Sequence, residues 1–132
     1  AAANPFVTHH AALDRYLYPV HGEMIARLTV RNTHWEPLRL QFPSSQVYDF
    51  VVRNDKGETV YQWSDGKAFL DLFRIQSYDY GEKNYALLAP LTDKAGNPLP
   101  AGKYTAEAWL STSAPRSYTA SAGFEIVDSF RP

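Results

Sequence analysis

The sequence predicts an all-β protein in which two antiparallel sheets pack face to face. Apolar and polar residues alternate in many short runs, and turn-forming residues separate these runs. Segments with helical periodicity are nearly absent. We count seven to nine short strands, too many to bury their apolar sides in one flat sheet, and we expect a sandwich rather than a closed barrel.

The composition is that of one globular domain, which we expect to span residues 1–132 as a monomer. Hydrophobic residues make up 45% and charged residues 20% of the chain. The net charge is −1 and no basic run occurs, which argues against nucleic acid or a membrane surface as a partner. Because the chain has no cysteine, it can form neither a disulfide nor a thiolate metal site.

The first half of the chain holds five candidate strands. Residues 11–18 fit either a strand or a helical stripe, and we prefer a strand because the neighbouring segments are strands. Residues 1–10 are compatible with an irregular arm. In residues 23–31, Met24, Ala26, Leu28 and Val30 share one face. The remaining strands expected here are 38–42, 47–53 and 59–63, the last two joined by a hairpin turn at residues 54–57.

In the second half, alternation predicts strands at residues 74–78, 84–88, 103–110 and 120–126. Residues 93–102 are rich in Gly and Pro and are expected to form a loop. Residues 69–73, FLDLF, fit neither period, so a helical turn and a strand stay equally open there.

The stretch QFPSSQVYDFVV, residues 41–52, raises the question of a catalytic triad. Ser44 or Ser45 could act as a nucleophile with Asp49 and one of the histidines. No glycine-flanked nucleophile motif is present, however, and a Pro-Ser-Ser connection is typical of a turn. We therefore expect Asp49 to be a half-buried acid paired with a hydroxyl, backbone or arginine partner, and we expect no catalytic residue. The histidines of the chain are His9, His10, His21 and His34.

The adjacent histidines His9 and His10, followed by His21, suggest a metal site. Neighbouring residues of a strand point to opposite faces, so His9 and His10 could bind one ion only in an irregular segment. Phosphate-binding glycine loops and dinucleotide motifs are absent. We expect no metal and no cofactor.

Two blocks, residues 30–69 and 99–110, carry a series of spaced positions that resemble the BsuPI family, the bacterial intracellular proteinase inhibitor domain. The resemblance implies an immunoglobulin-like sandwich without a disulfide, named for inhibiting an intracellular serine proteinase. The chain departs from the family in a longer connection between residues 78 and 101 and in extra segments at both ends. The positions that carry the resemblance are Asn32, Pro37, Leu38, Phe42, Pro43, Ser44, Gln46, Tyr48, Asp49, Phe50, Gly57, Trp63, Ser64, Gly66, Phe69, Pro100, Gly102, Tyr104, Ala108 and Leu110.

Residues 102–106, GKYTA, independently resemble the tyrosine corner of immunoglobulin-like sandwiches. Ala106 then occupies the place of a disulfide cysteine, and Trp63 is a candidate for the buried core tryptophan.

A proteinase-binding domain must hold a loop in place before it binds, and two loops of this chain qualify. One contains Ser64, Asp65 and Lys67, and the other contains Pro115 and Arg116. Each offers a long cation for a specificity pocket, although a plain turn with a solvated charge accounts for either loop. The alternative function is an accessory protein-interaction module without inhibitory activity. Trp109, expected on the outer face of its strand, is the candidate contact for that alternative.

The sequence allows two interpretations of where the protein is located. The start Ala1-Ala2-Ala3-Asn4-Pro5 resembles the small residues that remain after a signal peptide is removed, which suggests export. The family resemblance instead implies the cytoplasm. In both interpretations we expect a non-catalytic protein whose partner is a serine proteinase or another protein.

Overall fold

The computed structural model describes residues 6–114 and 118–128, and in these residues the chain forms ten strands and no helix. The all-β prediction is confirmed, with more strands than expected. The strands are β1 (Val7–Leu13), β2 (Leu17–Pro19), β3 (Glu23–Asn32), β4 (Leu38–Phe42), β5 (Tyr48–Asn54), β6 (Thr59–Gln62), β7 (Arg74–Tyr78), β8 (Gly81–Pro90), β9 (Gly102–Leu110) and β10 (Thr119–Val127).

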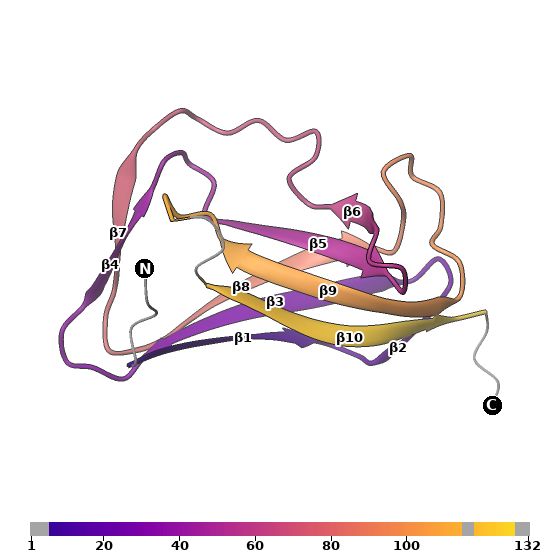
Figure 1. The fold of residues 1–132 in the computed structure, drawn as a ribbon, viewed down its shortest axis with the longest axis horizontal. Coiled ribbons are helices and arrows are strands. Elements are labelled where there is room, and N and C mark those ends of the chain that lie inside the picture. The colour runs from indigo at the N-terminus through magenta and orange to yellow at the C-terminus, as the bar shows by residue number, and fades with distance from the viewer. Residues whose placement is uncertain (1–5, 115–117, 129–132) are drawn as a thin grey trace.

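Two sheets pack face to face as an immunoglobulin-like sandwich (Figure 1). One sheet has the order β1-β3-β8 and the other has the order β2-β10-β9-β5-β6. The pairs are antiparallel except for β2, which runs parallel to β10. A separate ribbon of β4 and β7 stands at one end of the sandwich.

The core lies between the two sheets and follows the predicted alternation. On β3 the inward residues Met24, Ala26, Leu28 and Val30 are all buried. Each large apolar side chain of this kind contributes roughly 1.5–3 kcal/mol through its removal from water. The facing sheet contributes further buried residues, among them Phe50, Val52, Tyr104, Ala106, Ala108, Leu110, Phe124 and Ile126.

The tyrosine corner predicted at residues 102–106 is present. The Tyr104 hydroxyl donates a hydrogen bond to the Pro100 carbonyl at 2.6 Å, which ties the start of β9 to the loop before it. Ala106 is buried in the core, as expected for the position of a disulfide cysteine. Trp63 differs from the prediction: it lies in the turn after β6 and packs against the core while only partly buried.

The structure differs from the local predictions for three segments. Of the possible irregular arm at residues 1–10, residues 7–10 instead pair with β3 as the first part of β1, and residues 1–5 lie outside the described residues. The expected strand at 11–18 is interrupted: Asp14 follows β1, and its carboxylate accepts hydrogen bonds from the Tyr18 hydroxyl at 2.5 Å and from the Ile25 N–H at 3.0 Å. Residues 69–73 form neither helix nor strand.

The loop between β3 and β4 is held by one buried side chain, that of Asn32. Its amide donates to the carbonyls of Glu36 and Tyr78, each at 3.0 Å, and its carbonyl accepts the His34 N–H at 2.9 Å. Asn32 therefore joins this loop to the end of β7.

Candidate functional site

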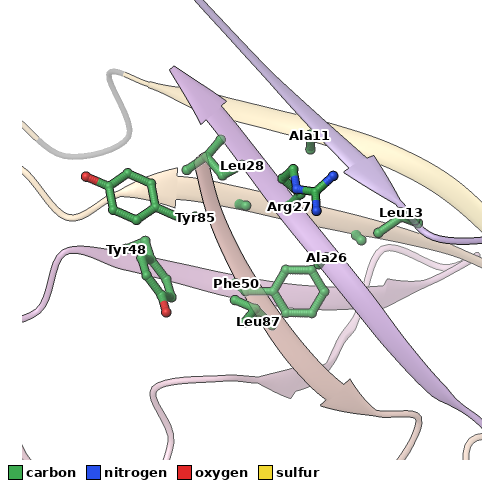
Figure 2. A pocket seen from close by; sticks show the side chains of 11 residues that line it. Ala11, Leu13, Ala26, Arg27, Leu28, Tyr48, Phe50, Tyr85 and Leu87 are labelled. Carbon is green, nitrogen blue, oxygen red and sulfur yellow. The ribbon is translucent and has the colours of Figure 1, made fainter. Parts of the chain in front are cut away.

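Three pockets among the described residues are either small or lie at loops. A cavity of about 10 Å³ lies between the sheets, lined by apolar side chains that include Ala26, Leu28 and Phe50 (Figure 2). This volume is about what one water molecule needs, so the space is too small for a larger ligand. Two hollows of about 210 and 240 Å³ open at loops, one at the turn from β7 to β8 and the other beside the Asn54–Lys56 turn and the start of β9. Neither is lined by a histidine.

Asp49 is a structural anchor for the turn that follows β6. It is only 5% exposed, which is more buried than the sequence suggested. Its carboxylate accepts four hydrogen bonds: from its neighbour's N–H (Phe50) at 2.8 Å, from the Gln62 amide at 2.8 Å, and from the Ser64 hydroxyl and N–H at 2.7 and 3.2 Å. The predicted hydroxyl and backbone partners are therefore present. The acid holds residues 62–64 and has no link to Ser44 or Ser45.

Ser44 and Ser45 form turn contacts of the kind that the sequence favoured. The Ser44 hydroxyl accepts the Gln46 N–H at 3.1 Å, which is a local side-chain turn. The Ser45 hydroxyl accepts the Leu70 N–H at 2.8 Å, and the Ser45 N–H donates to the Leu70 carbonyl at 3.0 Å. Ser45 thus fastens the connection between β6 and β7 to the loop before β5.

The connection from β6 to β7 comprises residues 63–73 and runs along one edge of the sandwich (Figure 1). It begins with two successive turns, in which the Asp65 N–H donates to the Gln62 carbonyl and the Lys67 N–H donates to the Ser64 carbonyl, each at 3.1 Å. Gly66 has a φ of +77°, a conformation that glycine adopts without strain. Ser64, Asp65 and Lys67 are therefore brought together in a folded turn.

Aromatic side chains support this connection from the inside. The rings of Trp63 and Tyr48 have centroids 4.9 Å apart, and the Phe69 centroid lies 6.0 Å from that of Trp63. The Lys67 ammonium lies 4.8 Å from the centre of the Trp63 ring, a cation–π contact. Lys67, for which the sequence left open a specificity-pocket role or a solvated charge, therefore contacts the protein's own indole.

The Tyr48 ring also contacts Tyr85 on β8, with centroids 5.4 Å apart, and so links the connection to the opposite sheet. The hydroxyls of Tyr85 and Tyr78 are hydrogen bonded at 2.8 Å. Burial raises the pKa of Tyr78 well above its ordinary value, and the hydrogen bond to Tyr85 is the second cause of this rise. The guanidinium of Arg74 at the start of β7 lies 5.4 Å from the Phe42 ring.

Beyond Phe69 the connection exposes apolar side chains that sequence reasoning missed. Leu70, Leu72 and Phe73 are 69%, 54% and 59% exposed, respectively. We call these three residues the apolar ridge. Their failure to fit the period of either a strand or a helix was the available signal, because an irregular segment of large apolar residues has no regular face to bury.

The other predicted contacts have mixed outcomes. Trp109 lies on the outer face of β9 as expected, but it is only 8% exposed, so its side chain is covered and not offered as an open aromatic contact. Trp109 on β9 lies opposite Asp49 on β5. The hydrogen bond from the Ser64 hydroxyl to Asp49 holds the turn after β6 at this position on the outer face of the sheet. Pro115 and Arg116 lie outside the described residues.

The histidines are placed separately. His9 and His10 are consecutive in β1, so their side chains point to opposite faces of the sheet. Among residues 6–114 and 118–128, no group of three His, Asp or Glu side chains is arranged to hold a metal ion. His34 instead stacks with the exposed Trp35, with ring centroids 5.6 Å apart.

Comparison with known families gives one match. The model of the BsuPI family, described as intracellular proteinase inhibitor, matches residues 12–115. This range runs from the end of β1 through β9 and includes the whole connection between β6 and β7. No curated protein matches the chain. In the part of the chain that the structure describes, no helix is long and apolar enough to cross a membrane.

Several solved structures share the fold at low identity. The chain aligns over 95% of its length with 31% of a DNA-bound alkylpurine DNA glycosylase from Pseudomonas fluorescens, at a TM-score of 0.55 and 15% identity. It aligns over 92% of its length with 15% of a β-glucosidase from Erythrobacter marinus, at a TM-score of 0.54 and 12% identity. It aligns over 98% of its length with 51% of the sporulation control protein Spo0M from Bacillus subtilis, at a TM-score of 0.50 and 11% identity. The chain spans less than two thirds of each, and these likenesses show the fold alone.

Proposed function

This chain belongs to the BsuPI family of intracellular proteinase inhibitors, and we propose that it binds a serine proteinase through surface loops at the edge of the sandwich, without catalysing a reaction. The observation that carries the proposal is the connection at residues 63–73, which lies inside the matched range and is held from beneath while its outer side is exposed. We expect an equimolar complex with a monomeric inhibitor.

The physical requirement for such an inhibitor is a loop that loses little conformational entropy when it binds. Many secreted inhibitors meet this requirement with disulfides, which a chain without cysteine cannot use. Here the hydrogen bonds that Asp49 and Ser45 accept, together with the packing of Trp63 on Tyr48, take that role. The turn with Ser64, Asp65 and Lys67 begins this connection and lies beside the surface that we assign to the partner.

The test is a titration of the purified chain against a trypsin-like and a subtilisin-like serine proteinase, with residual activity on a small substrate as the readout. We expect activity of at least one enzyme to fall to near zero at an equimolar ratio. Arg31→Ala, on the outer face of β3 and away from the connection, is the matched control and should inhibit as well as the wild type. Full activity of both enzymes at micromolar concentrations of the chain would refute the proposal.

A second candidate function is an accessory interaction module without inhibitory activity. It is favoured by Trp35, which is 79% exposed on the β3–β4 loop and stacks on His34, which itself contacts the Phe6 ring at 4.6 Å. Because Asn32 fixes this loop, the indole is presented at little entropic cost. Binding of a non-proteinase protein that is lost in Trp35→Ala, in a chain that inhibits neither enzyme, would support this function over the first.

A further inference from the structure

The apolar ridge consists of three large side chains on one short segment. In soluble monomers, neighbouring exposed apolar side chains of this kind mark an interaction site. Other exposed apolar residues, such as Ile25 and Leu88, lie opposite one another on a regular strand pair of the sheet β1-β3-β8. The ridge instead stands on an irregular connection, where no ladder of backbone hydrogen bonds determines its path.

Contacts on either side keep the ridge in place. At its start, both backbone groups of Leu70 are bonded to Ser45, and the preceding ring of Phe69 packs on Trp63. The Leu72 N–H donates to the Leu70 carbonyl at 2.9 Å, which closes a three-residue turn. At its end, the chain enters β7 at Arg74, which pairs with Phe42 of β4. A partner would therefore meet a segment that is already ordered.

The backbone next to the ridge is also available to a partner. In the part of the chain that the structure describes, β7 pairs with β4 on one edge and with no strand on the other. The backbone N–H and C=O groups of Phe73 have no hydrogen-bond partner among these residues. An extended segment of another protein can pair with such groups while its pockets take the side chains.

The chemistry of this surface favours apolar pockets over an acidic one. Lys67 lies over the Trp63 ring within a folded turn, so placing it in an acidic pocket would first break the cation–π contact. The leucine and phenylalanine side chains of the ridge already project into solvent, and their burial would add to the binding free energy directly.

We propose that the apolar ridge is the part of the chain that enters the substrate cleft of the target, and that this target is a serine proteinase whose specificity pocket takes large apolar side chains. This inference rests on the proposed inhibitory function and adds the contact residues and the class of enzyme. The turn at Ser64, Asp65 and Lys67 then lies beside the contact and contributes little to the affinity.

The experiment compares inhibition constants of single variants against subtilisin, which cleaves after large apolar residues, and trypsin, which cleaves after lysine and arginine. The variants are Leu72→Ala, Phe73→Ala and Lys67→Ala, with Leu88→Ala as the matched control because Leu88 is an exposed leucine that pairs with Ile25 in the sheet β1-β3-β8. All four side chains are exposed, so melting temperatures should stay close to that of the wild type.

We expect the wild type to inhibit subtilisin and not trypsin. Leu72→Ala and Phe73→Ala should each weaken inhibition by about 30-fold or more, the size of effect seen at binding hot spots. Lys67→Ala and Leu88→Ala should change it by less than about threefold.

Three results would overturn the inference. Inhibition of trypsin that is lost in Lys67→Ala would assign the contact to the cation. Inhibition of subtilisin that survives both ridge variants would place the contact elsewhere while leaving the inhibitory function intact. Sedimentation showing a wild-type dimer that dissociates in Phe73→Ala would assign the ridge to a second copy of the chain. Wild-type protein that inhibits neither enzyme would instead refute the function on which the inference rests.

Discussion

Removing the Asp49 carboxylate should loosen the whole connection between β6 and β7. Asp49→Ala removes the acceptor of three hydrogen bonds, which come from the Ser64 hydroxyl, the Ser64 N–H and the Gln62 amide. It also removes the acceptor of the local hydrogen bond from the Phe50 N–H. A hydrogen bond to a charged group contributes roughly 1.5–3 kcal/mol, but Ser64 and Gln62 are only partly buried and can regain water. We therefore expect a loss of about 3 kcal/mol in unfolding free energy, which corresponds to a melting temperature lower by about 10 °C for a domain of this size.

The assay is urea unfolding followed by tryptophan fluorescence, because Trp63 lies in the affected turn. Asp65→Ala is the control: this acid is exposed in the same turn, and its loss should change the free energy by less than about 0.5 kcal/mol. Asp49→Asn keeps one acceptor oxygen and should fall between the two. An Asp49→Ala protein as stable as the wild type, or an equal loss in Asp65→Ala, would refute the anchoring role.

Three further predictions concern other polar contacts. Tyr104→Phe removes the 2.6 Å bond to the Pro100 carbonyl and should lower the unfolding free energy by about 1 kcal/mol in urea. Asn32→Ala removes the three bonds of a buried amide and should cost about 2–3 kcal/mol, measured by thermal melting, while Thr33→Ala in the exposed part of the loop should cost less. The raised pKa of folded Tyr78 means that the unfolded chain releases its phenolic proton first as the pH rises past about 10. The unfolding free energy should therefore be independent of this group at lower pH and fall above about pH 10, and the fall should be shallower in Tyr78→Phe, as urea unfolding at about pH 8 and about pH 11 would show.

Alternation allowed most of the strands and the core face to be predicted from the sequence. A residue pointing inward at one position fixes the direction of its neighbours two places away, so the buried row on β3 could be assigned without knowing its partners. The same reasoning predicted that Asp49 would have polar partners, because a carboxylate on a mostly apolar strand needs them. It could not name Ser64 and Gln62, since their approach depends on the path of the turn after β6.

The errors in the prediction have a common physical cause. Alternation determines which face of a sheet a side chain occupies, but not whether a loop covers that face. Trp109 was placed on the correct face and is nevertheless buried. The ridge at residues 70–73 shows the converse case: apolar residues that look fit for a core lie exposed, because the path of the connection is set by contacts of Phe69 and Ser45. Such coverage depends on contacts between segments that are distant in the chain.

The residues that carry the family resemblance and the residues of the ridge divide the connection into two parts. Several positions of the resemblance hold the connection from beneath: Asp49 and Ser64 bond to each other, and Trp63 packs between Tyr48 and Phe69. The ridge residues lie outside that set and make their contribution at the surface. An inhibitor scaffold needs this division, because the anchoring contacts must stay fixed while the exposed side chains match the pocket of a particular enzyme. It follows that exchanging the ridge side chains should alter the choice of proteinase at nearly constant stability, whereas exchanging the residues beneath it should alter stability first and binding only as a consequence.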